Sequence, residues 1–346
     1  MLCCVGRHKL RANGGNWTLR KRDGTDITLG GGLAVALLAI AGFCVLSSPF
    51  RKLVPSHVWS FARKDASTAF DAVDLAKLHP LQLELADLIV EEDQPISVGA
   101  FADVWRGRYG ANDVAIKRLH QTTDVAMQKF TNEILLLTKL ESPFVVTLFG
   151  AIWHRSSGLA CVLEYMDLGN LRTFLARTSP QQYPWADKLL SIVAIVQAMI
   201  FLHTFSPPIL HRDLKSRNGT KLTDFGESRA ADDGTLTSGI GTYQWMAPEV
   251  IQGNEYTTAA DVYSFGVVLS ELSTHALPYA DQINPATQEP YNEHFIMRQV
   301  VAGRLWPTFD RTHTPAALRA IAHQCLETNP DHRPSMVEIY GTLASL

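Results

Sequence analysis

Hydrophobic residues change their spacing several times along the chain, and these changes divide it into segments. Between Ile27 and Phe50 no charged residue occurs, and the centre of this stretch, Leu33–Leu46, is apolar on every face of a helix. A helix of this length spans about 36 Å, and the hydrocarbon core of a bilayer is about 30 Å thick. The pattern predicts a transmembrane helix over 27–50 behind a basic, polar leader over 1–26. A buried core helix and a cleaved signal peptide fit the flanking residues less well.

Residues 51–84 show no clean period, so we expect a juxtamembrane linker there. A short helical pattern covers Ala69–Leu78. Pro80 is expected to end it, because proline disfavours a helical conformation in the residue before it.

Short β-like runs follow from about Leu85. One helical pattern interrupts them, in which apolar residues recur every three and four positions between Asp124 and Leu140. The predicted strands are Leu88–Val90, Asp103–Trp105, Val114–Lys117, Val145–Val146 and Ala160–Leu163.

After Gly169 the pattern becomes almost wholly helical. Leu189–Leu202 predicts a strongly apolar helix, and Asp261 opens another that is apolar enough all round to be buried. A β-rich small lobe over about 85–166, followed by a helical large lobe over about 167–346, is an α+β fold with a cleft between its lobes.

The composition favours a protein with a membrane segment and disfavours nucleic-acid binding, a disulfide framework and a zinc site. Charged residues make up 19% of the chain, below the roughly 25% of soluble proteins, which agrees with a membrane segment. The net charge of −3 disfavours nucleic acid as a partner. The five cysteines lack C-x₂-C spacing, so the sequence predicts neither a disulfide framework nor a zinc site.

Four motifs in the second part of the chain carry the chemistry. His211–Asn218 reads HRDLKSRN, Asp224–Gly226 reads DFG, Ala247–Glu249 reads APE, and Val114–Lys117 reads VAIK upstream of them. Together, in this order, they resemble the signatures of the protein kinase catalytic domain. The resemblance implies the two-lobed protein kinase fold and magnesium-dependent phosphoryl transfer from ATP.

The resemblance also implies a role for each polar residue of the motifs. Lys117 holds the α- and β-phosphates and is oriented by Glu133. Asp213 is the base that accepts the proton of the substrate hydroxyl, and Lys215 contacts the γ-phosphate. Asn218 and Asp224 are the implied magnesium ligands.

Further residues match the tyrosine-kinase-like group, whose members phosphorylate serine and threonine in proteins. The runs Glu164–Met166 and Trp245–Glu249 carry this likeness, and Lys215 two residues after Asp213 is the form usual for serine/threonine rather than tyrosine kinases. The nucleotide-binding residues that the resemblance implies are Ser97, Val98, Gly99, Val104, Ala115, Lys117, Leu163, Glu164 and Met166.

Three more residues are expected to brace the large lobe. Glu249 and Arg333 match a buried ion pair, and Asp261 is expected to support the catalytic loop. Thr235, Thr237 and Ser238 lie in the segment where phosphorylation orders the loop of related proteins.

The chain departs from the kinase pattern in two places. In the phosphate-binding loop only Gly99 of three glycines remains. Asn218 also lies six residues before Asp224, where the family pattern has about thirteen, so roughly seven residues are missing. The missing residues correspond to the strand after the catalytic loop and its turn, which in related kinases supply an apolar residue beneath the adenine. The alternative to a membrane-anchored serine/threonine kinase is therefore a pseudokinase that binds partners without turnover.

The predicted orientation in the membrane is in conflict with this function. A kinase domain needs cytosolic ATP, which places the N-terminus outside. Six Lys/Arg residues precede the apolar segment closely and four follow it, so the positive-inside rule slightly favours a cytosolic N-terminus. The sequence predicts no oligomeric state.

Overall fold

The computed structural model describes residues 10–13, 16–20, 26–29, 75–91, 93–99, 101–120, 123–154, 158–215, 221–230 and 243–345. The chain divides into two compact units, residues 6–60 and the remainder. In the smaller unit, three antiparallel strands form one sheet in the order β1-β2-β3. They are β1 (Leu10–Asn13), β2 (Asn16–Arg20) and β3 (Asp26–Leu29).

Strand β3 changes the prediction for the apolar segment. Ile27–Leu29 pairs with β2, in the register Trp17 to Leu29 and Leu19 to Ile27. The predicted transmembrane helix therefore does not begin at Ile27. Residues 30–50 lie outside the described part of the chain.

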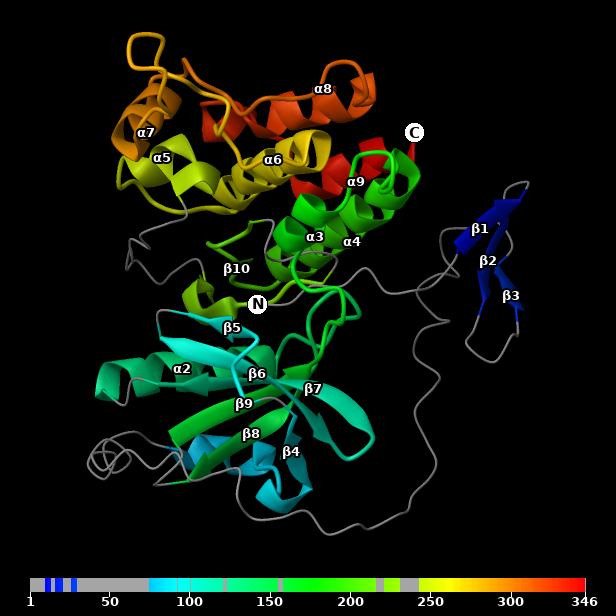
Figure 1. Cartoon of the computed structure of the whole chain (residues 1–346), viewed down its shortest axis with the longest axis vertical. Coiled ribbons are helices and arrows are strands. Elements are labelled where there is room, and N and C mark those ends of the chain that lie inside the picture. The colour runs from blue at the N-terminus through cyan, green and yellow to red at the C-terminus, as the bar shows by residue number, and fades with distance from the viewer. Residues whose placement is uncertain are drawn as a thin grey trace. The chain divides into compact units, whose positions relative to one another are not determined.

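The larger unit has two lobes, and Figure 1 shows the strands β4 to β9 with helix α2 in one and helices α3 to α9 in the other. The small lobe is an antiparallel sheet in the order β4-β6-β7-β9-β8, with β5 paired to β6. Its strands are β4 (Leu88–Val90), β5 (Ser97–Val98), β6 (Ala102–Tyr109), β7 (Asn112–Leu119), β8 (Leu148–His154) and β9 (Gly158–Glu164). This confirms the predicted sheet, except that Val145 and Val146 precede β8.

Helix α2 (Asp124–Leu137) packs on this sheet with the apolar positions that its sequence period predicts. Met127, Phe130 and Ile134 are buried. Thr123 caps the helix, because its hydroxyl accepts a hydrogen bond from the N–H of Ala126. Glu133 lies on the same buried side, so the packing of α2 fixes where this carboxylate points.

The end of the predicted linker packs on the small lobe. The 3₁₀ helix η1 (Leu75–Leu81) contacts α2 and β8, and Leu78 is fully buried. Pro80 lies inside η1 and does not end it, which corrects the prediction. A Cβ on Gly150 would lie 2.5 Å from the carbonyl oxygen of Leu81, so only glycine permits this close approach.

The large lobe is built around two apolar helices. These are α4 (Trp185–His203) and α6 (Thr258–Thr274), and they confirm the helices predicted over 189–202 and after Asp261. The helices around them are α3 (Leu171–Arg177), α5 (Pro248–Ile251), α7 (Glu293–Val301), α8 (Ala316–Cys325) and α9 (Met336–Ala344). Strand β10 (Ile209–Leu210) pairs with β11 (Arg229–Ala230) on either side of the catalytic motifs.

Helix α4 meets the length and hydropathy of a membrane span, and it alone does so among the described residues. Its residues Ile192, Ile195, Val196 and Met199 are buried in the large lobe, where α4 packs against α9 and α6. These contacts are those of a core helix.

Candidate active site

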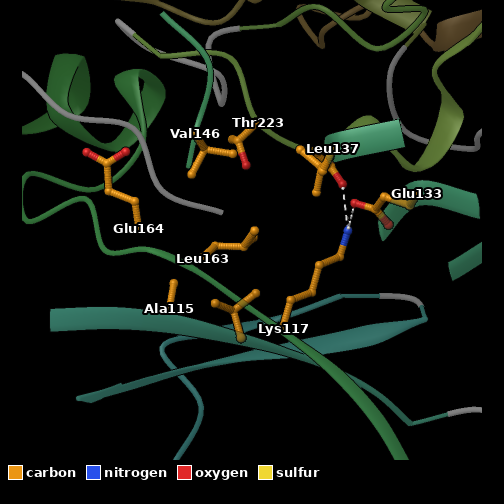
Figure 2. A pocket seen from close by; sticks show the side chains of 10 residues that line it. Ala115, Lys117, Glu133, Leu137, Val146, Leu163, Glu164 and Thr223 are labelled. Carbon is orange, nitrogen blue, oxygen red and sulfur yellow. Dashed lines mark hydrogen bonds and ion pairs between the residues drawn. The ribbon is translucent and has the colours of Figure 1, made fainter. Parts of the chain in front are cut away.

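The site lies in a pocket between the lobes, at the edge where β7 and α2 face the segment that carries Asp224. Lys117 extends from β7 into this pocket. Its Nζ lies 2.6 Å from Oε1 of Glu133 on α2 (Figure 2) and 3.1 Å from Oδ1 of Asp224. The structure thus brings together three residues that are distant in the sequence, as the motifs predicted.

Burial and charge act in opposite directions on these three groups. Burial alone would lower the pKa of Lys117, but Glu133 and Asp224 outweigh it and raise that pKa above its ordinary value. Burial likewise opposes the ionisation of Asp224, yet Lys117 and Lys215 hold its pKa below the usual range. Burial raises the pKa of Glu133. The ammonium is therefore charged, and Asp224 is ionised beside it.

The backbone at Asp224 contributes to this arrangement. Asp224 has a left-handed conformation with φ of 67°, which is uncommon for a residue other than glycine. The next residue, Phe225, is buried, and its ring lies 5.3 Å from that of His211. Packing of Phe225 thus holds the turn that aims the Asp224 carboxylate at Lys117.

The candidate base, Asp213, pairs with Lys215 through its Oδ2. Burial raises the pKa of Asp213 to about 6, an effect that Lys215 opposes and Asp224 increases. A carboxylate with this pKa is largely ionised at neutral pH and is still basic enough to accept a proton.

The backbone beside Asp213 is held by Asp261 at the start of α6. The Asp261 carboxylate is buried and accepts hydrogen bonds from the N–H of His211 (2.9 Å) and of Arg212 (3.0 Å). His203 and Tyr256 also bond to it, at 3.0 and 2.9 Å. The predicted support of the catalytic loop by Asp261 is confirmed.

A second predicted brace is also confirmed. Arg333 forms two parallel hydrogen bonds to Glu249, from Nη1 to Oε1 at 2.6 Å and from Nη2 to Oε2 at 2.8 Å. Both residues are buried, and Arg333 also bonds to the carbonyl oxygens of Glu327 and Ala259. This pair ties the start of α5 to the segment before α9.

Five of the predicted nucleotide-binding residues line the pocket. They are Val104, Ala115, Lys117, Leu163 and Glu164, and Figure 2 shows four of them with their labels. Leu137, Val146 and Thr223 also line it, and sequence reasoning did not single them out. Leu137 belonged to the predicted period of α2, and Thr223 directly precedes Asp224, but neither signal identifies a pocket residue.

The remaining predicted nucleotide-binding residues lie elsewhere. Ser97 and Val98 form β5 opposite Val104 and Asp103, and the side chain of Val98 is 73% exposed. The N–H of Gly99 donates to the carbonyl oxygen of Ala102 at 3.0 Å, and a Cβ on Gly99 would lie 2.7 Å from that oxygen. Met166 is buried after β9. Within the part that the structure describes, these four do not line the pocket.

Several predicted residues lie outside the described part of the chain. These are the second magnesium ligand, Asn218, and the activation-segment residues Thr235, Thr237 and Ser238. Among the residues the structure does describe, no group of three or more His, Cys, Asp or Glu side chains has the arrangement of a metal site. The two cysteines in the described ranges, Cys161 and Cys325, are buried free thiols.

The residues of the pocket fit a nucleotide with a divalent cation. Its walls near β6 and β9 are apolar, as the flat face of an adenine requires. Two carboxylates, Glu133 and Asp224, line the pocket beside one ammonium group, that of Lys117. The excess of negative charge suits a cation with hard oxygen ligands.

Comparison with known proteins agrees with this geometry. The family model for protein tyrosine and serine/threonine kinases matches residues 90–343. The chain belongs to this protein kinase family. Its kinase domain includes every motif of the site, from the phosphate-binding loop to Arg333.

The relatives of this kinase are long proteins. A RasGEF domain-containing serine/threonine-protein kinase X of Dictyostelium discoideum is 33% identical over 73% of this chain and 26% of its own length. A putative serine/threonine-protein kinase/receptor of Acanthamoeba polyphaga mimivirus is 33% identical over 55% of this chain and 12% of the relative. The dual specificity protein kinase splA of D. discoideum is 32% identical over 72% of this chain and 11% of its own length. The chain thus spans about a quarter or less of these relatives.

Proposed function

We propose that this chain is a serine/threonine protein kinase that transfers the γ-phosphoryl group of ATP to protein hydroxyls. The observation that supports the proposal most directly is the position of Lys117 between Glu133 and Asp224. A kinase requires this cation beside the phosphates and this carboxylate beside the metal. Asp213 and Lys215 stand close by as an ion pair.

Each residue has a part in the transfer. The oxygen of a substrate Ser or Thr bonds to the γ-phosphorus, the bond from that phosphorus to its bridging oxygen breaks, and ADP leaves. The hydroxyl proton passes to the Asp213 carboxylate, while Lys117 and Lys215 balance the charge of the phosphates. Magnesium, for which Asp224 and Asn218 are the proposed ligands, would neutralise phosphate charge when bound.

Serine and threonine are the proposed acceptors for two reasons. Lys215 stands two residues after Asp213, as in serine/threonine kinases, and two of the three relatives above have serine/threonine kinase in their names. Because one relative is named a dual specificity kinase, tyrosine is the alternative acceptor that an experiment should compare with serine and threonine.

The test is phosphate transfer from radiolabelled ATP and magnesium to peptides that differ only in their acceptor. We expect Ser and Thr peptides to be labelled, a Tyr peptide not to be, and Asp213→Asn to abolish the transfer. Labelling of the Tyr peptide alone would contradict the proposed specificity.

The pseudokinase alternative rests on the short connection between Asn218 and Asp224. The described residues do not favour it, because Lys117 contacts both Glu133 and Asp224 as catalysis requires. Binding of MgATP without any transfer, under conditions in which a control kinase is active, would establish it instead.

We also propose that the apolar segment anchors the kinase domain at the cytosolic face of a membrane. The support is hydropathy: residues 30–50, which follow β3, contain no charge and as a helix would span about 32 Å, still enough for a bilayer. Full-length protein should resist carbonate extraction from membranes. Leu38→Arg should reduce insertion, because a charge at the centre of the bilayer costs about 2.5–3.5 kcal/mol. Full-length protein that fractionates as soluble would contradict the anchor.

A further inference from the structure

The segment just before Asp224 is tied to the opposite side of the nucleotide pocket. Lys221 is the first described residue after the short connection, and its Nζ lies 2.8 Å from Oε1 and 2.7 Å from Oε2 of Glu164. Glu164 ends β9 and lines the pocket, where Figure 2 shows its side chain. The ion pair joins residues 57 positions apart in the chain.

Glu164 is itself held in place by a third segment. Its Oε2 accepts a hydrogen bond from the hydroxyl of Thr147 at 3.1 Å and from the N–H of Thr147 at 3.3 Å. The N–H of Glu164 in turn donates to the carbonyl oxygen of Thr147 at 2.9 Å. Because Thr147 already orients the Glu164 carboxylate, this side chain loses little further conformational freedom when it pairs with Lys221.

The residue after Lys221 is fixed by backbone hydrogen bonds. The N–H of Leu222 donates to the carbonyl oxygen of Phe144 at 2.8 Å, and the N–H of Val146 donates to that of Leu222 at 2.9 Å. Leu222 is fully buried. Thr223 then lines the pocket, and Asp224 reaches Lys117. The four consecutive residues 221–224 therefore connect Glu164 to the proposed metal ligand, Asp224.

We propose that Lys221 and Glu164 form a clamp that positions the segment 221–224 for nucleotide binding. About seven residues that precede this segment in the family pattern are missing from the sequence, and with them the strand beneath the adenine. The clamp supplies an attachment to the end of β9 that does not depend on that strand. Lys221 is a positioning residue in this role, because it acts through Glu164 and Asp224.

The side chains of Lys221 and Glu164 are 25% and 31% exposed, so water partly screens the pair. We therefore expect a moderate effect on nucleotide affinity. Lys221→Met and Glu164→Gln should each weaken the binding of MgATP about fivefold, as measured by calorimetry. Because the clamp acts on binding, KM for ATP should rise by a similar factor, with a smaller change in kcat.

Three further variants separate a clamp from general destabilisation. The double variant should bind MgATP no more weakly than either single variant, because both single changes break the same pair. Lys221→Arg should retain most of the affinity. Lys139→Met removes an exposed lysine of the small lobe and should leave the affinity unchanged. A thermal melt of each variant confirms that the comparison is made on folded protein.

Three results would overturn the clamp: unchanged affinity in both single variants, effects that add in the double variant, or tighter binding when the pair is broken. The last would mean that the pair restrains the pocket. The proposed clamp depends on the proposed function only in that the chain must bind MgATP. A wild-type chain that binds MgATP but transfers no phosphate would contradict the proposed activity and leave the binding comparison valid, and one that binds no MgATP would contradict both.

Discussion

Asp261 and His211 are 50 residues apart in the chain, yet the buried carboxylate of Asp261 accepts a 2.9 Å hydrogen bond from the backbone N–H of His211. The bond connects a deeply buried helix of the large lobe to the loop that carries Asp213. Rigid packing of α6 is thereby transmitted to the catalytic base through two backbone N–H groups and one carboxylate.

Replacement of Asp261 tests this connection. Asp261→Asn should lower the free energy of unfolding by about 3 kcal/mol, because an amide has one acceptor oxygen and four donors converge on the carboxylate. It should also lower kcat, since the loop loses its support. Urea unfolding and initial rates measure the two effects. Asp331→Asn, at an exposed position, is the control and should change neither.

Two carboxylates of the site should differ in how they affect ligand binding. Asp213→Asn and Asp224→Asn should each abolish phosphate transfer, but only Asp224→Asn should weaken magnesium-dependent binding of nucleotide. The base acts in the transition state, whereas the metal ligand already acts in the ground state. Calorimetric titration with MgATP distinguishes them, and equal affinities in the two variants would refute the assigned roles.

The pKa of Asp213 predicts a pH dependence of activity. With this pKa raised to about 6, activity should fall as the pH decreases through this value, because the protonated carboxyl accepts no proton. Lys215 lowers the pKa of Asp213, so Lys215→Met should move the acid limb of the pH-rate profile to higher pH. Because the same peptide and ATP are used for the wild type and the variant, ionisation of the substrates contributes equally to the two pH-rate profiles. A limb at the same pH in both would exclude Asp213 as its origin.

The packed end of the linker should contribute to stability and activity. Leu78→Ala removes a fully buried side chain between η1 and the small lobe and should lower the free energy of unfolding by about 2–5 kcal/mol, as measured by urea unfolding. Leu85→Ala, at a residue 36% exposed, should have a much smaller effect.

A shortened chain tests whether this packing also reaches the active site. A protein that begins at residue 85 should show lower kcat than one that begins at residue 75, because η1 contacts the helix that carries Glu133. Equal rates in the two proteins would show that η1 stabilises the lobe without orienting Glu133.

The sequence alone determined the order of the lobes and the identity of the main chemical groups. Apolar residues at every three and four positions identified α2, and stretches that are apolar all round identified α4 and α6. The resemblance of short motifs to the protein kinase signatures identified Lys117, Asp213 and Asp224, and phosphoryl transfer requires a cation, a base and a metal ligand of these residue types.

The tertiary structure decided the contacts between distant segments. Leu78 belongs to the core of the small lobe although its local pattern resembled a linker, because its burial depends on α2 and β8. Val146 and Thr223 line the pocket because two segments lie side by side through the backbone of Leu222. Lys221 meets Glu164 for the same reason. Local periodicity reports which face of an element is buried, whereas the partner of that face is set by how the whole chain packs.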